Sequence, residues 1–273
     1  MRFLEGNLIS FFTSGFPSHV KVNAVDVGFY GSNEFVSFFD GKVLSVEKFK
    51  VGRPNKYALT DYDYLILAES GRKVIKILHV EPYLEPGEEF RQGDTLGETI
   101  LSPYTGGDFR HAHLEGIKLS FPKITSVREE GIGEVIHVTE GYVDIQLRTF
   151  SQAGDLNGLG CCGGLLNGSI PYAGYGGIIG INLSRNITLL GRNYRATSSR
   201  KNVTLFEVKR GLLRNWEYGP VFKVLRNEPI DGYPLIESIL SYKGKPFVRI
   251  FKKLSLDEGD EVDVWSLTGN NMG

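Results

Sequence analysis

Short apolar runs bounded by turn residues repeat along the whole chain and constrain its fold more than any other feature. Asp40-Gly41 lies between two such runs, and Ser70-Gly71 separates another pair. A turn dipeptide between apolar runs is typical of a β-hairpin. The 34 glycines supply many turn positions, and long runs of Ala, Leu, Glu and Lys at helical spacing are missing. The pattern predicts an all-β, antiparallel chain of many short strands.

Charge and hydropathy exclude several classes of protein. The formal net charge is −1, which favours neither nucleic acid nor an anionic membrane as a partner. No stretch approaches the roughly 20 apolar residues that a membrane-spanning helix needs. The first residues lack the apolar core and cleavage site of a signal peptide. We therefore expect a cytoplasmic chain that binds no membrane and no nucleic acid. The sequence does not indicate an oligomeric state.

His111-Ala112-His113 is the most distinctive local motif. The chain has only five histidines, and these two are one residue apart in a stretch that favours a strand. Residues i and i+2 of a strand point to the same face, so two imidazoles would project side by side. Neutral imidazole is both a common zinc ligand and a proton shuttle. A bare His-x-His also fits two surface histidines, so its meaning depends on partners elsewhere in the chain.

Three other residues can provide such partners. Asp26 lies within an apolar run over residues 20–29, where a carboxylate is costly to bury unless it is paired, bound to metal or hydrogen-bonded to turn amides. His79 closes a predicted strand over residues 73–80. His19 follows a predicted turn at residues 13–18.

Taken in chain order, these motifs resemble those of the lysostaphin-type zinc metallopeptidases, which share the duplicated-hybrid-motif β fold. The resemblance covers about residues 15–118. It rests on Asp26 followed by Asp40-Gly41-Lys42-Val43, on His79-Val80 followed by Gly87 and Gln92-Gly93-Asp94, and on His111-Ala112-His113-Leu114-Glu115. Four motifs in the right order are more specific than any one of them.

The resemblance implies a role for each matching residue. Asp26 and His113 would be zinc ligands, and His79 and His111 would be the catalytic histidines beside the metal. One histidine would act as general base on a zinc-activated water, and the other would stabilise the tetrahedral oxyanion. Glu115 shares the strand face of His113 and is either a carboxylate that orients a histidine or a solvated glutamate.

The third zinc ligand is where the chain departs from the family pattern. The family places its first histidine four residues before the aspartate, a position that is Val22 here. The nearest histidine is His19, seven residues before Asp26. On a regular strand this offset would put the two side chains on opposite faces and roughly 23 Å apart. We expect His19 to be the third ligand, which requires residues 19–23 to fold back as a turn or bulge.

The implied function is a zinc-dependent hydrolase that cleaves peptide or peptide-like amide bonds, with a peptide or a peptidoglycan-like molecule as substrate. One alternative is a non-catalytic metal-binding, ligand-binding or regulatory module on the same fold, with a degenerate site at Val22. Another is a sugar-phosphotransfer domain that carries phosphate on His79 or His111. Asp26 beside these histidines argues against phosphotransfer, because it would repel the phosphoryl group.

The second half of the chain carries no motif of known chemistry. We place a domain boundary near Phe121-Pro122, which gives a metallopeptidase-like domain over residues 1–120 and a β-rich sandwich or barrel of unknown role over residues 121–273. A hairpin is predicted around Glu140-Gly141, and a strand over residues 260–267.

Residues 154–180 are unusual because they hold ten glycines and a single charged residue. They predict either a series of tight hairpins packed on the sheet or a loop that borders the active-site cleft. Cys161 and Cys162 are adjacent within this segment and are the only cysteines. A disulfide between neighbours is strained and rare, and two adjacent thiols alone make a poor metal site.

Overall fold

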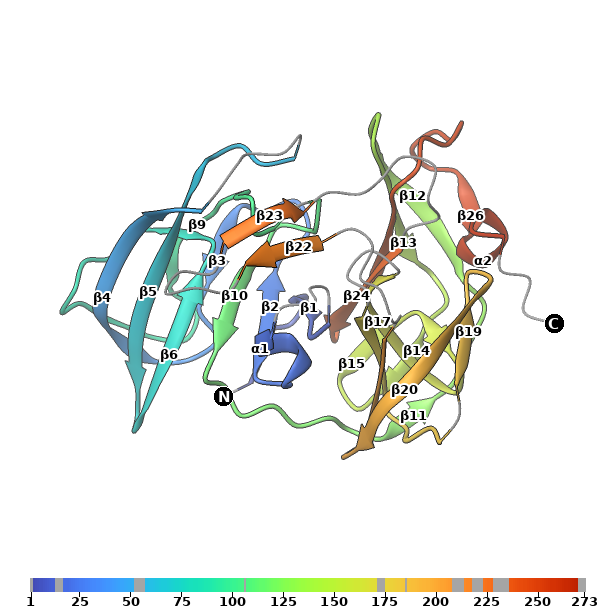
Figure 1. Ribbon diagram of the computed structural model, residues 1–273, viewed down its shortest axis with the longest axis horizontal. Helices are drawn as coiled ribbons and strands as arrows, with labels where there is room; N and C mark the ends of the chain where they lie inside the picture. The colour runs from blue at the N-terminus through green and yellow to red at the C-terminus, as the bar shows by residue number, and fades with distance from the viewer. Residues whose placement is uncertain are drawn as a thin grey trace. The chain divides into compact units, whose positions relative to one another are not determined.

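The chain is built almost entirely of β-strands, as the computed structural model in Figure 1 shows. The structure describes residues 2–12, 17–51, 57–105, 107–170, 175–184, 186–207, 214–217, 223–227 and 236–269. Every strand pairing whose register is defined there is antiparallel, for example β10 with β2 and β5 with β6. The prediction of an all-β, antiparallel fold is confirmed. No helix in these ranges is long and apolar enough to cross a membrane.

The chain divides into two compact units. The first consists of Met1–Ile9, Phe16–Leu119 and Leu213–Glu228, and the second of Ser10–Gly15, Ser120–Leu212 and Pro229–Gly273. The main division therefore falls between Leu119 and Ser120. Two short segments do not follow this division. Ser10–Gly15 belongs to the second unit, and Leu213–Glu228 belongs to the first.

In the first unit, strands pair in the order β8-β4-β5-β6-β10-β2. A smaller sheet has the order β3-β9-β7, and β22 pairs with β23. The elements of this unit are α1 (Pro17–Val20), β2 (Ala24–Gly28), β3 (Glu34–Val36), β4 (Gly41–Lys50), β5 (Tyr62–Ser70), β6 (Lys73–Leu78), β7 (Val80–Pro82), β8 (Glu89–Phe90), β9 (Thr95–Thr99), β10 (Ala112–Glu115), β22 (Arg214–Glu217) and β23 (Lys223–Asn227). Strand β1 (Leu8–Ser10) ends at the point where the chain passes to the second unit.

Two hairpin predictions have different outcomes in this unit. Ser70-Gly71 joins β5 to β6 as predicted, and Gly71 has the positive φ of 62° that suits a tight turn. The hairpin predicted at Asp40-Gly41 is wrong, because β3 pairs with β9 while β4 pairs with β5 and β8. A Cβ on Gly41 would come within 2.8 Å of the Glu69 carbonyl oxygen, so close approach of the backbone explains this glycine.

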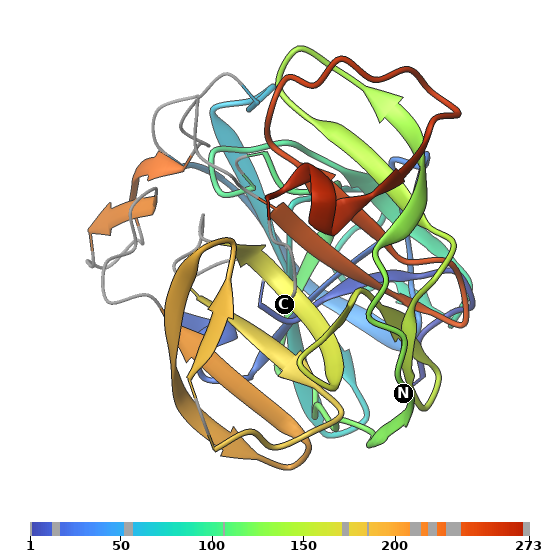
Figure 2. The same cartoon turned by 90° about the vertical axis from the view of Figure 1, so that its right-hand side faces the viewer.

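The second unit is a continuous series of paired strands in the order β26-β12-β13-β25-β24-β17-β18-β21-β20-β19. Figure 2 shows the yellow and orange strands β18, β20 and β21 side by side. The elements are β11 (Ile124–Ser126), β12 (Ile132–Val138), β13 (Val143–Leu147), β14 (Ser151–Ala153), β15 (Leu156–Gly158), β16 (Gly160–Cys161), β17 (Gly164–Ile170), β18 (Tyr175–Ile179), β19 (Ile187–Leu189), β20 (Arg192–Arg200), β21 (Val203–Glu207), β24 (Ile236–Tyr242), β25 (Phe247–Ile250), β26 (Glu261–Asp263) and α2 (Val264–Leu267).

The hairpin predicted around Glu140-Gly141 forms between β12 and β13. The glycine-rich segment forms tight hairpins, which is the first of its two predicted alternatives. Strand β14 pairs with β15, and β16 pairs with β17. Residues 171–174 of that segment and residues 13–16 of the turn before His19 lie outside the described ranges. The strand predicted over residues 260–267 is wrong in its second half. Helix α2 begins after Asp263, whose side chain accepts the Trp265 N–H at 3.0 Å and so caps the helix.

Candidate metal centre

Strand β10 organises the candidate site because it pairs with β2 on one side and β6 on the other. In the β10–β2 register His113 lies opposite Asp26, and in the β10–β6 register it lies opposite Leu78. Directly opposite residues of an antiparallel pair point to the same face. The sheet therefore sets His113 beside Asp26, and His79 comes directly after Leu78.

The interval between His19 and Asp26 is not one continuous strand, because helix α1 and its C-terminal cap precede β2. The Val22 N–H donates to the His19 carbonyl at 2.9 Å, and the Asn23 N–H donates to the Ser18 carbonyl at 2.9 Å. These two bonds define the Schellman motif, which ends a helix with a residue in the left-handed conformation. Val22 occupies that position with a φ of 57°.

The helical turn brings His19 back towards the sheet. Strand β2 consequently begins at Ala24, within the apolar run over residues 20–29. The turn or bulge that His19 needs is present, and it takes the form of helix α1 with its C-terminal cap. The His19 side chain is fully buried.

Three ligand-type atoms converge at the resulting site. Asp26 Oδ1 lies 2.8 Å from His113 Nδ1 and 3.3 Å from His19 Nε2, and the two nitrogens are 3.1 Å apart. Zinc–nitrogen bonds of about 2.0–2.1 Å at the tetrahedral angle place ligand atoms roughly 3.3–3.4 Å apart. The donor set of two imidazoles and one carboxylate, with this spacing, therefore fits a zinc ion with small adjustments.

Glu115 contacts the opposite edge of the His113 ring. Its Oε1 lies 3.4 Å from His113 Nε2, and its Oε2 lies 3.5 Å from the Lys76 ammonium. This contact lowers the pKa of Glu115 to about 2. A carboxylate that accepts the second N–H of a ligating histidine fixes which nitrogen faces the metal. The geometry therefore favours the orienting interpretation of Glu115 over the solvated one.

His111 is buried beside the three convergent atoms. Its Nδ1 lies 2.6 Å from the Phe109 carbonyl oxygen, which can only accept, so Nδ1 carries the proton. Its Nε2 lies 3.7 Å from Asp26 Oδ1. Burial lowers the pKa of His111 to about 4, although Asp26 opposes the shift. The neutral ring thus turns an unprotonated nitrogen towards the centre.

His79 is held by a carboxylate that the sequence analysis overlooked. Asp63 Oδ2 lies 2.6 Å from His79 Nδ1 and accepts the Ser102 hydroxyl at 2.7 Å. Its Oδ1 accepts the backbone N–H groups of His79 at 2.9 Å and Tyr64 at 2.7 Å. Burial raises the pKa of Asp63, but His79 and these donors outweigh it and hold the pKa below its ordinary value. Asp63 is an acid among apolar and aromatic residues of the sequence, in what the structure shows to be β5, and the same signal identified Asp26.

The backbone of His79 is left-handed, with a φ of 65°. This conformation is uncommon for a residue other than glycine and concentrates at functional sites. The His79 ring lies 5.4 Å from the His111 ring and 5.8 Å from the His113 ring, measured between centroids. All five residues that the sequence singles out, namely His19, Asp26, His79, His111 and His113, therefore come together in the first unit.

Ionisation of the site favours a bound cation. Burial raises the pKa of Asp26, but His19, His111 and His113 outweigh it and hold the pKa well below its ordinary value. His113 has its pKa raised to about 9, because hydrogen bonds to Asp26 and Glu115 overcome the effect of burial. Asp26 is therefore ionised, and a proton on His113 occupies the place that a metal ion would take.

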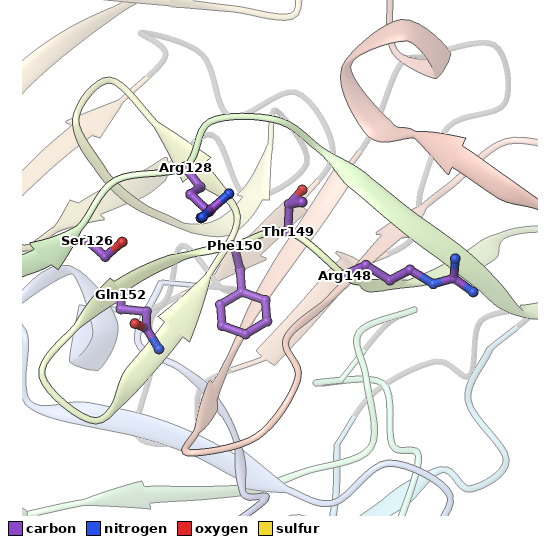
Figure 3. Close-up of a pocket in the computed structure, with 6 residues that line it drawn as sticks. All are labelled: Ser126, Arg128, Arg148, Thr149, Phe150 and Gln152. Atoms are coloured by element: carbon purple, nitrogen blue, oxygen red, sulfur yellow. The ribbon is translucent and has the colours of Figure 1, made fainter.

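The fifth histidine, His137, lies in β12 of the second unit and is half exposed beside Glu258. The second unit also has a pocket, drawn in Figure 3. Its lining residues are Ser126, Arg128, Arg148, Thr149, Phe150 and Gln152. Arg148 forms ion pairs with Glu134 and Glu261. Because no histidine, cysteine or acid lines this pocket, it does not rival the cluster in the first unit as a candidate centre.

A family model described as "Domain of unknown function (DUF8155) N-terminal domain" matches residues 4–128. This match includes every residue of the candidate metal centre. No curated protein matches the chain, and no solved structure matches it. The first part of the chain is thus similar to a domain whose description assigns no activity.

Proposed function

We propose that the chain is a zinc-dependent hydrolase of lysostaphin type that cleaves peptide or peptide-like amide bonds. The observation that carries the proposal is the convergence of His19 Nε2, Asp26 Oδ1 and His113 Nδ1 next to the unprotonated Nε2 of His111. A bound zinc ion would supply a Lewis acid that lowers the pKa of water to about 7 and polarises the scissile carbonyl.

His111 is the general base of this proposal. Because its Nδ1 proton is committed to the Phe109 carbonyl, its Nε2 accepts the proton of the attacking water. The ring is fully buried and its tautomer is fixed by a backbone group, so no reorientation is needed before proton transfer. The same nitrogen can then return the proton to the leaving amine.

His79 is the group that stabilises the oxyanion. The Asp63 carboxylate accepts from its Nδ1, which leaves Nε2 as the nitrogen available to the substrate. Asp63 is itself fixed by Ser102 and by two backbone N–H groups, so the ring is oriented before substrate binds. Asp63 is thus a positioning residue.

The competing function is a metal-binding or regulatory module without catalysis. Such a module needs only His19, Asp26 and His113, which hold the ion. It gives no role to the buried Asp63–His79 pair or to the fixed tautomer of His111, and these two features favour the hydrolase. A peptide or a peptidoglycan-like molecule is the proposed substrate, because its amide carbonyl is the group on which this constellation would act.

The test combines zinc analysis with peptide cleavage. Zinc content is measured by mass spectrometry of the purified chain after equilibration with zinc, and cleavage is followed on a mixed peptide library and on peptidoglycan fragments. We expect about one zinc per chain and amide cleavage, both lost in His113→Ala and both kept in His137→Ala. Absence of tight zinc binding would overturn the proposal, whereas zinc binding without cleavage of any peptide or wall fragment would establish the non-catalytic module.

A further inference from the structure

The two cysteines form a second chemical cluster, in the tight turn between β16 and β17. Cys161 is the last residue of β16 and pairs with Gly164, so Cys162 and Gly163 are the two central residues of the turn. Both have a positive φ, of 59° and 86°, as a type I′ turn requires. The two sulfur atoms are 2.9 Å apart.

The turn is fixed and its two thiols differ in exposure. Glu129 Oε1 accepts the Gly163 N–H at 2.6 Å and so ties the turn to the preceding segment. The Cys161 side chain belongs to the hydrophobic core of the second unit and is only 1% exposed. Cys162 is half-buried at the edge of that core. A reagent from solution therefore reaches Cys162 first, and the buried Cys161 sulfur lies next to the Cys162 sulfur.

From this geometry we infer that Cys161 and Cys162 form a reversible disulfide-forming site, modified by low-molecular-weight disulfides such as oxidised glutathione. The thiolate of Cys162 attacks one sulfur of the reagent, which forms a mixed disulfide and releases one glutathione thiolate. The sulfur of Cys161, after losing its proton, attacks Cys162, which closes the Cys161–Cys162 bond and releases the second glutathione. Two protein thiols are oxidised, one reagent disulfide is reduced, and the two protons pass to the two glutathione molecules.

Reversibility follows from the chemistry of adjacent cysteines. A bond between neighbouring residues closes an eight-membered ring, which is strained, and strained disulfides are the readily reduced ones. The structural role that a secreted disulfide plays is therefore excluded, and a labile modification remains. The left-handed turn already holds the sulfur atoms in contact, so ring closure needs only a small movement. This inference is independent of the proposed zinc chemistry.

The test uses the full chain, reduced and then freed of reductant, with an excess of oxidised glutathione. Because the chain has two cysteines, the outcome is read as a change from two free thiols to none. Both cysteines fall in the tryptic peptide of residues 149–185. We expect a monomer lighter by two hydrogen atoms, with the loss mapped to that peptide, and recovery of both thiols on adding dithiothreitol.

Single-cysteine variants give the matched controls. Cys161→Ser keeps the accessible thiol and should accumulate the mixed disulfide with one glutathione, while Cys162→Ser should react about tenfold more slowly because its thiol is buried. The inference is overturned if the wild-type chain keeps a bound glutathione, forms dimers or retains two thiols under conditions that fully modify Cys161→Ser. Equal rates for the two variants would overturn the assignment of Cys162 as the attacking thiol.

Discussion

Each unit buries polar side chains in its sheet, and the two clusters differ in how their charges are satisfied. In the second unit Arg249 donates from its Nε to Asp144 Oδ1 at 2.7 Å and from a terminal nitrogen to Oδ2 at 2.9 Å. Its guanidinium also lies 3.8 Å from the centre of the Tyr142 ring. Strand register sets Asp144 opposite Arg249, just as it sets Asp26 opposite His113 in the first unit.

The difference lies in the balance of donors and acceptors. The Arg249–Asp144 pair is bidentate, each of its two bonds joins a donor and an acceptor of opposite charge, and the buried Glu237 lies opposite Arg249 as a second carboxylate. At the candidate metal centre the Asp26 carboxylate faces ring nitrogens of His19, His111 and His113. Those nitrogens interact favourably with the carboxylate only when a proton or another cation lies between them. A buried polar cluster that contains its own permanent cation is structural, whereas one with surplus acceptors is suited to bind a cation.

The largest expected effect comes from removing the charge at the centre of that cluster. Asp26→Asn keeps the side-chain volume but replaces the ionised oxygen, so zinc affinity should fall by at least about 100-fold, more than the loss of a residue that only supports a ligand. Amide cleavage should disappear with it. Isothermal titration with zinc and the peptide assay check this, with the exposed Asp257→Asn as control. Unchanged zinc affinity would show that Asp26 is not a ligand.

Breaking the Arg249–Asp144 ion pair of the second unit should affect stability instead of metal binding. Arg249→Met leaves a buried, unpaired Asp144, which costs about 3–5 kcal/mol, whereas Arg249→Met combined with Asp144→Leu should recover only part of this loss, because the buried Glu237 opposite Arg249 also loses its cation. Urea denaturation measures both. Zinc affinity should not change in either variant. If the double variant is as unstable as the single one, the unpaired Asp144 is not the source of the loss.

The proposed roles of His79 and Asp63 separate catalysis from metal binding. We expect kcat to fall by about 10²-fold in His79→Ala. Asp63→Asn should cause a smaller loss of kcat with KM unchanged, because the amide orients the His79 ring less firmly than the carboxylate does. Zinc content should remain that of the wild type in both variants, as measured by mass spectrometry. Loss of zinc in either variant would place the Asp63–His79 pair among the metal-holding groups.

A pH dependence of stability should follow from Asp63. Its pKa is lower in the folded chain than the ordinary value of about 3.9 expected in the unfolded chain. The ionised carboxylate therefore contributes stability that is fully present above about pH 4 and is lost as the pH falls through the folded value. The difference in unfolding free energy between wild type and Asp63→Asn should thus be largest above pH 4 and shrink in acid. A difference that grows in acid would contradict this sign.

The smallest expected effect concerns the turn that presents His19. Val22 is a β-branched residue in the left-handed conformation, which costs about 1–2 kcal/mol relative to glycine. Val22→Gly loses part of this gain through the greater freedom of the unfolded chain, so a net stabilisation of about 1 kcal/mol or less is expected. Thermal unfolding and zinc titration check that stability rises while affinity is kept.

The sequence correctly predicts features that depend on neighbouring residues. Its predictions fail where pairing between distant segments determines the structure. The turn at Ser70-Gly71 forms because its glycine supplies the φ that the turn needs. Asp40-Gly41 has the same local signal, but pairing of β3 with β9 prevails over it. The turn after His19 places a valine in a conformation that it rarely adopts, so no periodicity reveals it.

Asp63 shows a different limit. Its partner His79 is sixteen residues away, and the two meet only because β5 and β6 pair in a register that sets Leu65 opposite Leu78. We expected the site residues to converge because their motifs resemble a known family in order. The spacing of the motifs alone did not predict this convergence of His19, Asp26, His79, His111 and His113. Motif order survives changes in loop length, whereas the exact position of a ligand in space depends on how each loop closes.

Helix α1 has a consequence for the mechanics of the molecule. Asp26 and His113 belong to neighbouring strands, whereas His19 belongs to a four-residue helix that is joined to the sheet through a strained link. An ion shared by the three would act as a tether between this helix and the sheet. A chelator would remove this ion and the link with it. Amide hydrogen exchange over residues 18–23 should then become faster before exchange increases in any strand of the sheet.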